Sequence, residues 1–285
     1  MRLPFVVLLA ALTFAGGIAA AGESRPRVET FTVLTSAPEN RNLEFAIRLP
    51  RNFSPSRARI LVTFGGRNWG AKQTLDTYRF DDFADEYGLV VVAPGFVNDD
   101  YWEPEKWSGA ALEDALARIR KTHHIPDTPL LYYGYSAGGQ CASLFYAWKP
   151  AKVAAWAAHA CGVWFDDIPD SIRLAPALVT CGVEDQPRYD FGRHFAFRYR
   201  EAGGELTWRD YPGGHELIPE AAELARAFFA SILESGSPPI LVGDDGSGQV
   251  YTVDSRQAEH VPAELRSVFR TQAFADLWQR QTRRK

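Results

Sequence analysis

The stretch that decides the fold runs from residue 130 to residue 139: Leu130-Leu131-Tyr132-Tyr133-Gly134-Tyr135-Ser136-Ala137-Gly138-Gly139. An apolar run ends abruptly at Ser136, which lies in the pattern Gly-x-Ser-x-Gly. In a nucleophile elbow, such a serine tops a sharp turn from a buried strand into a helix, and its hydroxyl is exposed. We expect Gly134 and Gly138 to be required, because Cβ atoms there would collide as strand and helix fold back on each other.

The pentapeptide alone is weak evidence, since a serine between glycines is more often a plain turn residue. Its context strengthens it, because a strand-like apolar run precedes it and residues 139–146 continue as a plausible helix. Seven further stretches have the apolar character of strands: residues 28–34, 43–49, 58–64, 89–93, 153–160, 177–181 and 205–211.

Helical spacing of apolar residues separates most of these strands. Four stretches show it, namely residues 80–87, 112–119, 191–202 and 224–232. Strands that alternate with helices form a mostly parallel sheet covered on both faces. The predicted fold class is therefore α/β, with a mostly parallel eight-stranded sheet and helices on both faces.

Residues that could form an active site follow several of the predicted strands. Gly66 follows one strand end, and Ser136, Asp185 and His215 each follow another. In open parallel sheets the site lies beyond the carboxyl ends of the strands, so we expect these residues to meet. Acyl transfer needs a nucleophile, a base and an orienting acid, which would be Ser136, His215 and Asp185 in that order. Glu184 and His159 remain as the alternative acid and base.

These features resemble the α/β-hydrolase superfamily, in which the triad follows the chain order serine, acid, histidine. Within it, the chain is similar to secreted serine esterases of the polyester (polyhydroxybutyrate) depolymerase and feruloyl esterase type. The resemblance covers about residues 27–234. It implies hydrolysis of carboxylic esters through an acyl-enzyme, without a cofactor or metal. The interval from Gly162 to Leu174 is too short for a large lid domain.

The resemblance also implies an oxyanion hole made of two backbone N–H groups. One belongs to Ala137, directly after the nucleophile, and the other to Gly66 or Arg67 in the loop after an earlier strand. Members of the superfamily often carry a histidine before this loop. Phe64 replaces it here, so the choice between Gly66 and Arg67 stays open.

Aromatic residues are frequent in or near the strand-end loops. We expect some of them to form a substrate-binding surface and the others to fill the core. The candidates for substrate binding are Trp69, Trp102, Trp107, Tyr135 and Trp164, and their neighbours Tyr101 and Phe165 belong to the same loops.

Composition fits one globular domain. The chain has 285 residues, 46% hydrophobic residues and a net charge of −4. This length allows a substantial core. The charge gives no reason to expect nucleic acid or an anionic membrane as a partner. The expected partner is a small-molecule or polymeric ester, and the expected state is a monomer.

The N-terminal segment from Met1 to Ala21 has the features of a secretory signal peptide: a basic start, an apolar core and a small-residue cleavage site. An uncleaved membrane anchor is the alternative. We therefore expect a secreted or periplasmic protein with one domain over residues 22–285. Its core would span about residues 27–234, followed by a C-terminal extension over residues 235–285. Two helices are predicted in the extension, at Pro262–Phe269 and Thr271–Trp278.

Three cysteines occur in apolar surroundings: Cys141, Cys161 and Cys181. Buried thiols are the favoured interpretation. A disulfide between two of them stays open, because an exported protein permits one. No spacing of cysteine and histidine resembles a zinc site.

The sequence thus predicts a secreted serine hydrolase of carboxylic esters. A serine peptidase or amidase of the same fold is the first alternative, since the same triad serves both reactions. A catalytically inactive binding module is the second.

Overall fold

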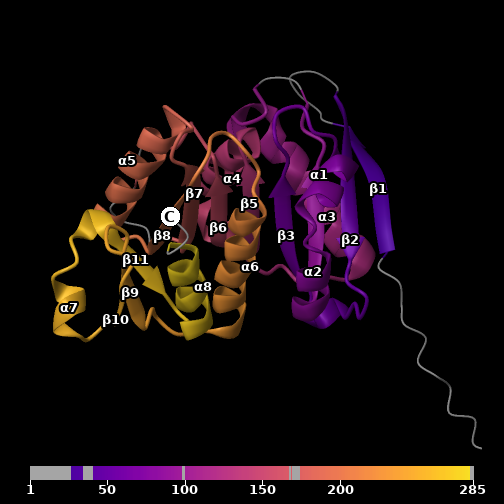
Figure 1. Cartoon of the computed structure of the whole chain (residues 1–285). Helices are drawn as coiled ribbons and strands as arrows, with labels where there is room; N and C mark the ends of the chain where they lie inside the picture. The colour runs from indigo at the N-terminus through magenta and orange to yellow at the C-terminus, as the bar shows by residue number, and fades with distance from the viewer. Residues whose placement is uncertain (1–26, 35–40, 98–99, 167, 169–173, 283–285) are drawn as a thin grey trace, which may run out of the picture.

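An eight-stranded sheet forms the centre of the protein in the computed structural model, which describes residues 27–34, 41–97, 100–166, 168 and 174–282 (Figure 1). The predicted signal peptide lies outside these residues. The strands are β1 (Arg27–Leu34), β2 (Asn42–Leu49), β3 (Arg59–Phe64), β4 (Leu89–Pro94), β5 (Leu130–Tyr135), β6 (Val153–His159), β7 (Ala177–Gly182) and β8 (Leu206–Tyr211).

The spatial order of the strands is β1-β2-β4-β3-β5-β6-β7-β8. The strands β1 and β2 form an antiparallel hairpin at one edge, and β2 is also antiparallel to β4. All other neighbours are parallel. The prediction of a mostly parallel eight-stranded sheet is confirmed. The carboxyl ends of β3 and β5 to β8 therefore lie along one rim.

Helices cover both faces of this sheet, as expected. They are α1 (Ala71–Tyr78), α2 (Asp81–Tyr87), α3 (Gly109–His123), α4 (Ala137–Trp148), α5 (Arg188–Glu201), α6 (Pro219–Glu234) and α8 (Gln272–Thr282). The short helix α7 (Arg256–Glu259) lies within the C-terminal extension. Residues of α3, α4 and α5 share one apolar cluster with the sheet, and residues of α1, α2, α6 and α8 share the other.

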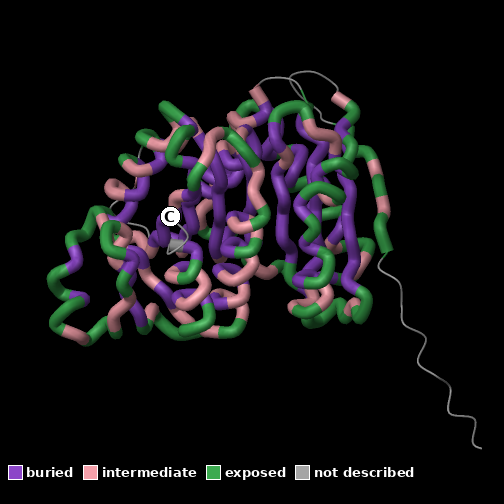
Figure 2. Tube along the Cα trace, in the orientation of Figure 1, coloured by how far each residue is buried: buried purple, intermediate pink, exposed green. Residues whose placement is uncertain are grey.

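The central strands are buried on both sides, as Figure 2 shows in purple. Along β5, Leu130 and Tyr132 join one cluster, whereas Leu131 and Tyr133 join the other. This alternation follows from the two-residue period of a strand. A continuous apolar run was therefore the right signal for a strand covered on both faces.

The helix α1 was missed by the sequence analysis. Its buried residues are Ala71, Thr74 and Tyr78, which have helical spacing but include a threonine and a hydroxyl-bearing ring. Lys72 and Gln73 separate them, so no apolar stripe was visible. The missed helix matters for the site, because Tyr78 contacts two strand ends there.

All three cysteines are buried free thiols, which settles the question of a disulfide within the chain. No lid domain is present in the described part of residues 160–176, which contains no helix or strand. Among the described helices, none combines the length and apolar character needed to cross a membrane.

The C-terminal extension forms a second, three-stranded sheet. Its order is β10-β9-β11, with β9 (Leu241–Asp244), β10 (Val250–Thr252) and β11 (Arg266–Phe269). The prediction of a helix over Pro262–Phe269 is wrong. Ser267 and Phe269 are buried on alternate positions, and β11 pairs antiparallel with β9. The second predicted helix corresponds to α8.

The extension covers the open edge of the large sheet. Its strand β11 packs beside β8, and α8 packs beside α6 (Figure 1). The N–H of Trp208 in β8 donates to Ser267 Oγ at 2.9 Å, and the indole Nε1 of Trp278 donates to the Trp208 carbonyl at 2.7 Å. The side chains of Ser267 and Trp278 thus form hydrogen bonds with main-chain groups of β8 that an unpaired edge strand would expose to another chain.

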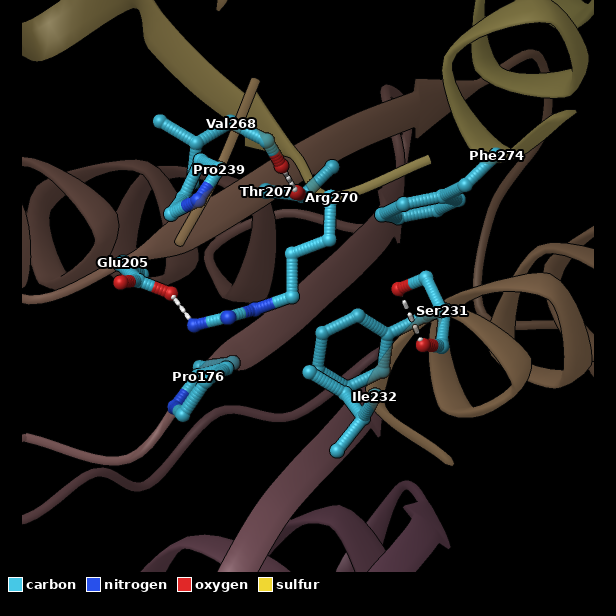
Figure 3. A pocket seen from close by; sticks show the side chains of 11 residues that line it. Pro176, Glu205, Thr207, Ser231, Ile232, Pro239, Val268, Arg270 and Phe274 are labelled. Atoms are coloured by element: carbon cyan, nitrogen blue, oxygen red, sulfur yellow. Dashed lines mark hydrogen bonds and ion pairs between the residues drawn. The ribbon is translucent and has the colours of Figure 1, made fainter. Parts of the chain in front are cut away.

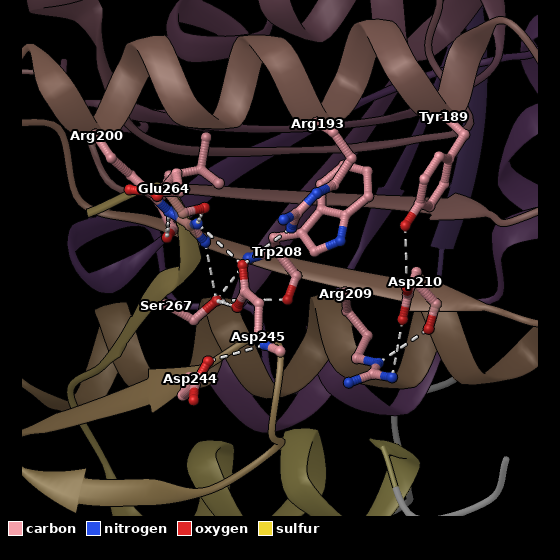
Figure 4. A network of polar contacts seen from close by, with 12 residues as sticks. Tyr189, Arg193, Arg200, Trp208, Arg209, Asp210, Asp244, Asp245, Glu264 and Ser267 are labelled. Carbon is pink, nitrogen blue, oxygen red and sulfur yellow. Dashed lines mark hydrogen bonds and ion pairs between the residues drawn. The ribbon is translucent and has the colours of Figure 1, made fainter. Parts of the chain in front are cut away.

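A buried ion pair holds this contact, as Figure 4 shows. Arg200 of α5 donates to Asp245 Oδ2 at 2.9 Å and to Ser267 Oγ at 3.0 Å. The Ser267 hydroxyl in turn donates to Asp245 Oδ1 at 2.6 Å. Burial raises the pKa of Asp245 and lowers the pKa of Arg200. The charge of Arg200 therefore depends on Asp245, which also pairs with Arg193 at 3.2 Å, because Arg200 and Asp245 are both shielded from water.

A second contact lies at the start of β8 (Figure 3). Arg270 of the extension pairs with Glu205, and Thr207 Oγ1 donates to the Val268 carbonyl at 2.7 Å. The cavity between these residues measures about 10 Å³, which is room for about one water molecule. The extension is thus packed directly on the core and leaves no ligand site there.

Replacing Asp245 with alanine should strongly destabilise the protein, because it leaves the buried charge of Arg200 unpaired. The expected loss in the free energy of unfolding is about 3–5 kcal/mol, measured by urea denaturation. Asp254→Ala is the matched control, since Asp254 is exposed in a turn and should change stability by less than about 0.5 kcal/mol. Equal effects of the two substitutions would contradict the role given to the ion pair.

Candidate active site

The turn between β5 and α4 holds Ser136 in an unusual backbone conformation. Its φ is +56° and its ψ is −121°, a region that residues other than glycine rarely adopt. Ser136 N–H donates to the His159 carbonyl at 2.9 Å. This contact joins the turn to the neighbouring strand β6. The serine side chain is therefore presented beyond the strand end, as the sequence pattern predicts.

Two glycines allow this turn through close backbone approaches. A Cβ atom on Gly134 would lie 2.0 Å from the Gly138 carbonyl oxygen, as the predicted collision requires. A Cβ atom on Gly138 would lie 2.0 Å from the carbonyl oxygen of Phe64. The obstacle at Gly138 is thus the end of β3 rather than β5. The start of α4 is consequently pressed against the loop that follows β3.

The structure brings Ser136, His215 and Asp185 together. Ser136 Oγ lies 2.8 Å from His215 Nε2, and His215 Nδ1 lies 2.7 Å from Asp185 Oδ2. We assign the proton of the neutral imidazole to Nδ1, since the carboxylate accepts only. Nε2 is then free to accept the serine proton. This is the arrangement of a nucleophile, a general base and an orienting acid.

Asp185 is buried and held on both oxygens. Its Oδ1 accepts from Arg188 Nη1 at 3.0 Å, while Oδ2 faces the imidazole. The thiol of Cys181 lies 3.8 Å from Oδ2, and burial together with this carboxylate raises the pKa of Cys181 to about 12. The alternative acid Glu184 is exposed, and its N–H donates to the Gly213 carbonyl.

The alternative base His159 is buried and has other partners. Its Nδ1 lies 2.8 Å from Thr180 Oγ1, and its Nε2 lies 2.8 Å from the Glu216 carbonyl. Since a carbonyl only accepts, Nε2 carries the proton and Nδ1 accepts from the threonine hydroxyl. Burial lowers the pKa of His159 to about 4. The two ring nitrogens of His159 therefore bond to Thr180 and Glu216, and neither bonds to Ser136.

The predicted oxyanion donors come from two segments that touch. Ala137 is the first residue of α4, where backbone N–H groups have no partner within the helix. Gly66 is buried under the ring of Trp69, and Arg67 beside it is exposed. The contact of Gly138 with the end of β3 brings these two segments side by side.

Tyr78 of α1 bonds to both strands that end at this site. Its hydroxyl donates to the Phe64 carbonyl at 2.6 Å and accepts from the N–H of Tyr135 at 2.9 Å. One hydroxyl therefore bridges the ends of β3 and β5. The sequence analysis missed Tyr78, because its helix was not predicted and nothing in a lone tyrosine indicates this role. Arg188, the partner of Asp185, was missed because the predicted helical stretch began only at residue 191 and a lone arginine does not indicate this role.

The aromatic candidates divide between site and core. Trp69 is half-buried and packs on Tyr135 with ring centroids 6.0 Å apart. Tyr135 is only 9% exposed and stacks on His215. Trp107 is 2% exposed, and its indole donates to Asp100. Trp107 therefore lies in the core of this structure. Trp102 is half-buried against the core.

Trp164 lines a pocket of about 320 Å³ between the segment after β6 and α5. Its ring stacks on Phe195 of α5 at 4.5 Å, and Phe191 is half exposed at the same pocket. Gly162, which also lines the pocket, packs against the side chain of Arg188. The pocket thus adjoins the support of Asp185. Within the described ranges, no cluster of histidine, cysteine or carboxylate side chains could hold a metal ion.

Solved structures share this architecture and this order of elements. No protein-family model and no curated protein matches the sequence. A ferulic acid esterase matches in structure with a TM-score of 0.58, at 17% identity over 67% of this chain and 92% of that one. The chain has the α/β-hydrolase fold.

Two further α/β-hydrolases resemble the chain. An S-formylglutathione hydrolase from Agrobacterium tumefaciens has a TM-score of 0.59 at 16% identity, over 73% of this chain and 95% of that one. A poly(3-hydroxybutyrate) depolymerase from Bordetella parapertussis has a TM-score of 0.54 at 19% identity, over 72% and 89%. These similarities establish the fold, and the activity must be argued from the site.

Substituting Gly138 with alanine should disrupt the turn, because the added Cβ atom would overlap the backbone of β3. We expect a loss of about 1–3 kcal/mol or more in the free energy of unfolding. Gly236→Ala is the control, since no atom lies within 4 Å of a Cβ at Gly236. Thermal and urea denaturation of both variants would test this, and an unchanged Gly138 variant would contradict the tight approach.

The buried His159 should make stability depend on pH. Its pKa is about 4 in the folded protein against 6.5 ordinarily, so between these values only the unfolded chain binds the proton. The free energy of unfolding therefore falls as the pH falls through this window, by roughly 3 kcal/mol for this residue.

Urea denaturation at several pH values would check this expectation against His159→Gln. The stability of the wild type relative to the variant should drop by roughly 3 kcal/mol between pH 7 and pH 4. A difference that stays constant with pH would show that His159 is not buried as a neutral ring.

Proposed function

We propose that the protein is a serine hydrolase that cleaves carboxylic esters through an acyl-enzyme. The observation that carries this proposal is the continuous chain of contacts from Ser136 Oγ to His215 and from His215 to Asp185, at 2.8 and 2.7 Å. The fold supports it, since the chain shares it with esterases. The three side chains come from the ends of β5, β7 and β8.

In the proposed reaction, Ser136 Oγ attacks the ester carbonyl carbon while His215 Nε2 accepts the hydroxyl proton. The C–O bond to the alcohol then breaks, and the imidazolium returns the proton to the departing alcohol. Water attacks the acyl-enzyme with His215 again as base, which releases the acid and restores Ser136. Asp185 keeps Nδ1 protonated and stabilises the imidazolium.

The oxyanion of the tetrahedral intermediate would bind to backbone N–H groups. We assign Ala137 as one donor and Gly66 or Arg67 as the other. The N-terminus of α4 carries partial positive charge, which also favours an anion there. Each donor of this kind contributes about 3 kcal/mol to the transition state.

The substrate would be a small-molecule or polymeric ester. Trp69, which packs on Tyr135, and the pocket around Trp164 offer aromatic surfaces in loops that follow strands, and Trp102 offers a third. We propose that at least one of them holds the acyl or alcohol group. Tyr135 contributes little to such a surface, because its ring is covered by His215.

We also propose that residues 1–21 direct export and that residues 22–285 act as a single monomeric domain, secreted or periplasmic. The motivation is the charge and apolar pattern of the first residues. The mass of the protein recovered from a periplasmic or culture fraction would test it. Recovery with residues 1–21 intact in the membrane fraction would overturn it.

Replacing Ser136 with alanine should lower ester turnover by about 10⁴- to 10⁶-fold, because the nucleophile is removed. Hydrolysis of p-nitrophenyl esters of increasing acyl length would measure this. Ser56→Ala serves as control, since Ser56 is exposed at the opposite end of the sheet, and it should keep full activity.

The same assay separates the competing functions. Cleavage of peptide anilides in preference to esters would favour a peptidase or amidase. Retained ester turnover in Ser136→Ala would refute the proposed nucleophile. Failure of a fluorophosphonate probe to label Ser136 in the wild type would favour an inactive binding module.

A further inference from the structure

Two successive carbonyl groups of the loop after β8 accept hydrogen bonds from side chains of the sheet. The Tyr135 hydroxyl donates to the carbonyl of His215 at 3.1 Å. The Nε2–H of His159 donates to the carbonyl of Glu216 at 2.8 Å. These donors come from β5 and β6, so they reach the loop from two different strands. The backbone on the C-terminal side of the His215 ring is therefore tied down twice.

The loop needs this restraint at His215. Its preceding part is anchored otherwise, because a Cβ atom on Gly182 would lie 2.4 Å from the carbonyl oxygens of both Gly213 and Gly214. Gly213 has a φ of +100°, and no atom lies within 4 Å of a Cβ on Gly213 or Gly214. Gly213 can take this positive φ without strain, which lets the chain turn just before the backbone of His215 meets the two donors.

The donors are themselves fixed in place. The ring of Tyr135 lies between two imidazoles, with centroids 5.3 Å from His215 and 5.7 Å from His159. Its backbone N–H donates to Tyr78. The Nδ1 of His159 accepts from Thr180 Oγ1 at 2.8 Å, across the ladder from β6 to β7. Neither side chain can shift without breaking another buried contact.

The same two residues also hold Ser136. Tyr135 precedes Ser136 directly in the chain, and the N–H of Ser136 donates to the carbonyl of His159 at 2.9 Å. The nucleophile and the base are thus attached to one shared support. Bonds through Tyr135 and His159 therefore contribute to the separation of Ser136 Oγ and His215 Nε2, together with the contact of His215 Nδ1 with Asp185 Oδ2.

We propose that Tyr135 and His159 are positioning residues that clamp the His215 loop and so set the distance over which Ser136 loses its proton. The inference rests on the proposed function of the Ser136 site. In this proposal His159 holds the loop and is not the general base, which was its alternative role in the sequence analysis. Tyr135 likewise holds the loop and does not bind substrate. Misplacing a reacting group by about 1 Å costs about a hundredfold in rate.

The test uses three substitutions in the full-length protein. Tyr135→Phe removes only the hydroxyl, and His159→Leu removes the donor to Glu216. His159→Gln keeps an amide N–H at about the same reach. We expect kcat to fall about ten- to a hundredfold in the first two variants with KM unchanged, and to recover largely in His159→Gln. Recovery in the glutamine variant is not expected of a ring that only fills space.

Tyr133→Phe is the matched control. Tyr133 lies two positions earlier on the same strand and joins the same apolar cluster, and its buried hydroxyl has no hydrogen-bond partner among the described residues. Its kcat should equal that of the wild type. Equal losses in Tyr133→Phe and Tyr135→Phe would overturn the proposal.

Hydrogen exchange provides a readout that does not need activity. Peptides covering residues 212–218 should exchange faster in Tyr135→Phe and His159→Leu than in the wild type, at a temperature where both variants are folded. Unchanged exchange together with unchanged kcat would overturn the clamp. If the wild type hydrolyses no ester and binds no fluorophosphonate, the proposed function fails. The exchange rates alone then test whether Tyr135 and His159 hold the His215 loop.

Discussion

At the carboxyl ends of the parallel strands, the backbones of α4 and β3 approach closely, and the rest of the structure depends on this contact. The start of α4 lies against the end of β3 because Gly138 has no side chain, and β5 can turn at Ser136 because Gly134 has none. The strain of a positive φ at Ser136 persists because the strands on both sides hold it. The same contact brings the first N–H groups of α4 next to the loop after β3, where an oxyanion would bind.

The edge strand β8 connects the site to the C-terminal extension. Its exit loop carries His215, and its outer main-chain groups at Trp208 are bonded by Ser267 and Trp278 of the extension. A strand with an open edge would fray or pair with another chain. The buried pair of Arg200 and Asp245 joins α5 to the extension beside this edge. The extension thus supports the strand whose exit loop carries His215.

Charge and hydrogen bonding around the triad separate two histidines of similar appearance in the sequence. His215 is partly exposed, and its Nδ1 lies 2.7 Å from Asp185 Oδ2. His159 is buried between a hydroxyl and a carbonyl, and burial lowers its pKa to about 4. The two rings therefore differ in exposure and in hydrogen-bond partners, although both lie near the carboxyl ends of strands.

The sequence by itself determined the sheet, the turn at Ser136 and the order of Ser136, Asp185 and His215, because apolar periodicity and glycine placement are local properties. Only the tertiary structure decided which aromatic rings fill the core, as Trp107 does, and which side chains brace the site. It also decided that β11 is a strand. These outcomes depend on contacts between segments far apart in the chain, and local sequence does not encode which partner a side chain will meet.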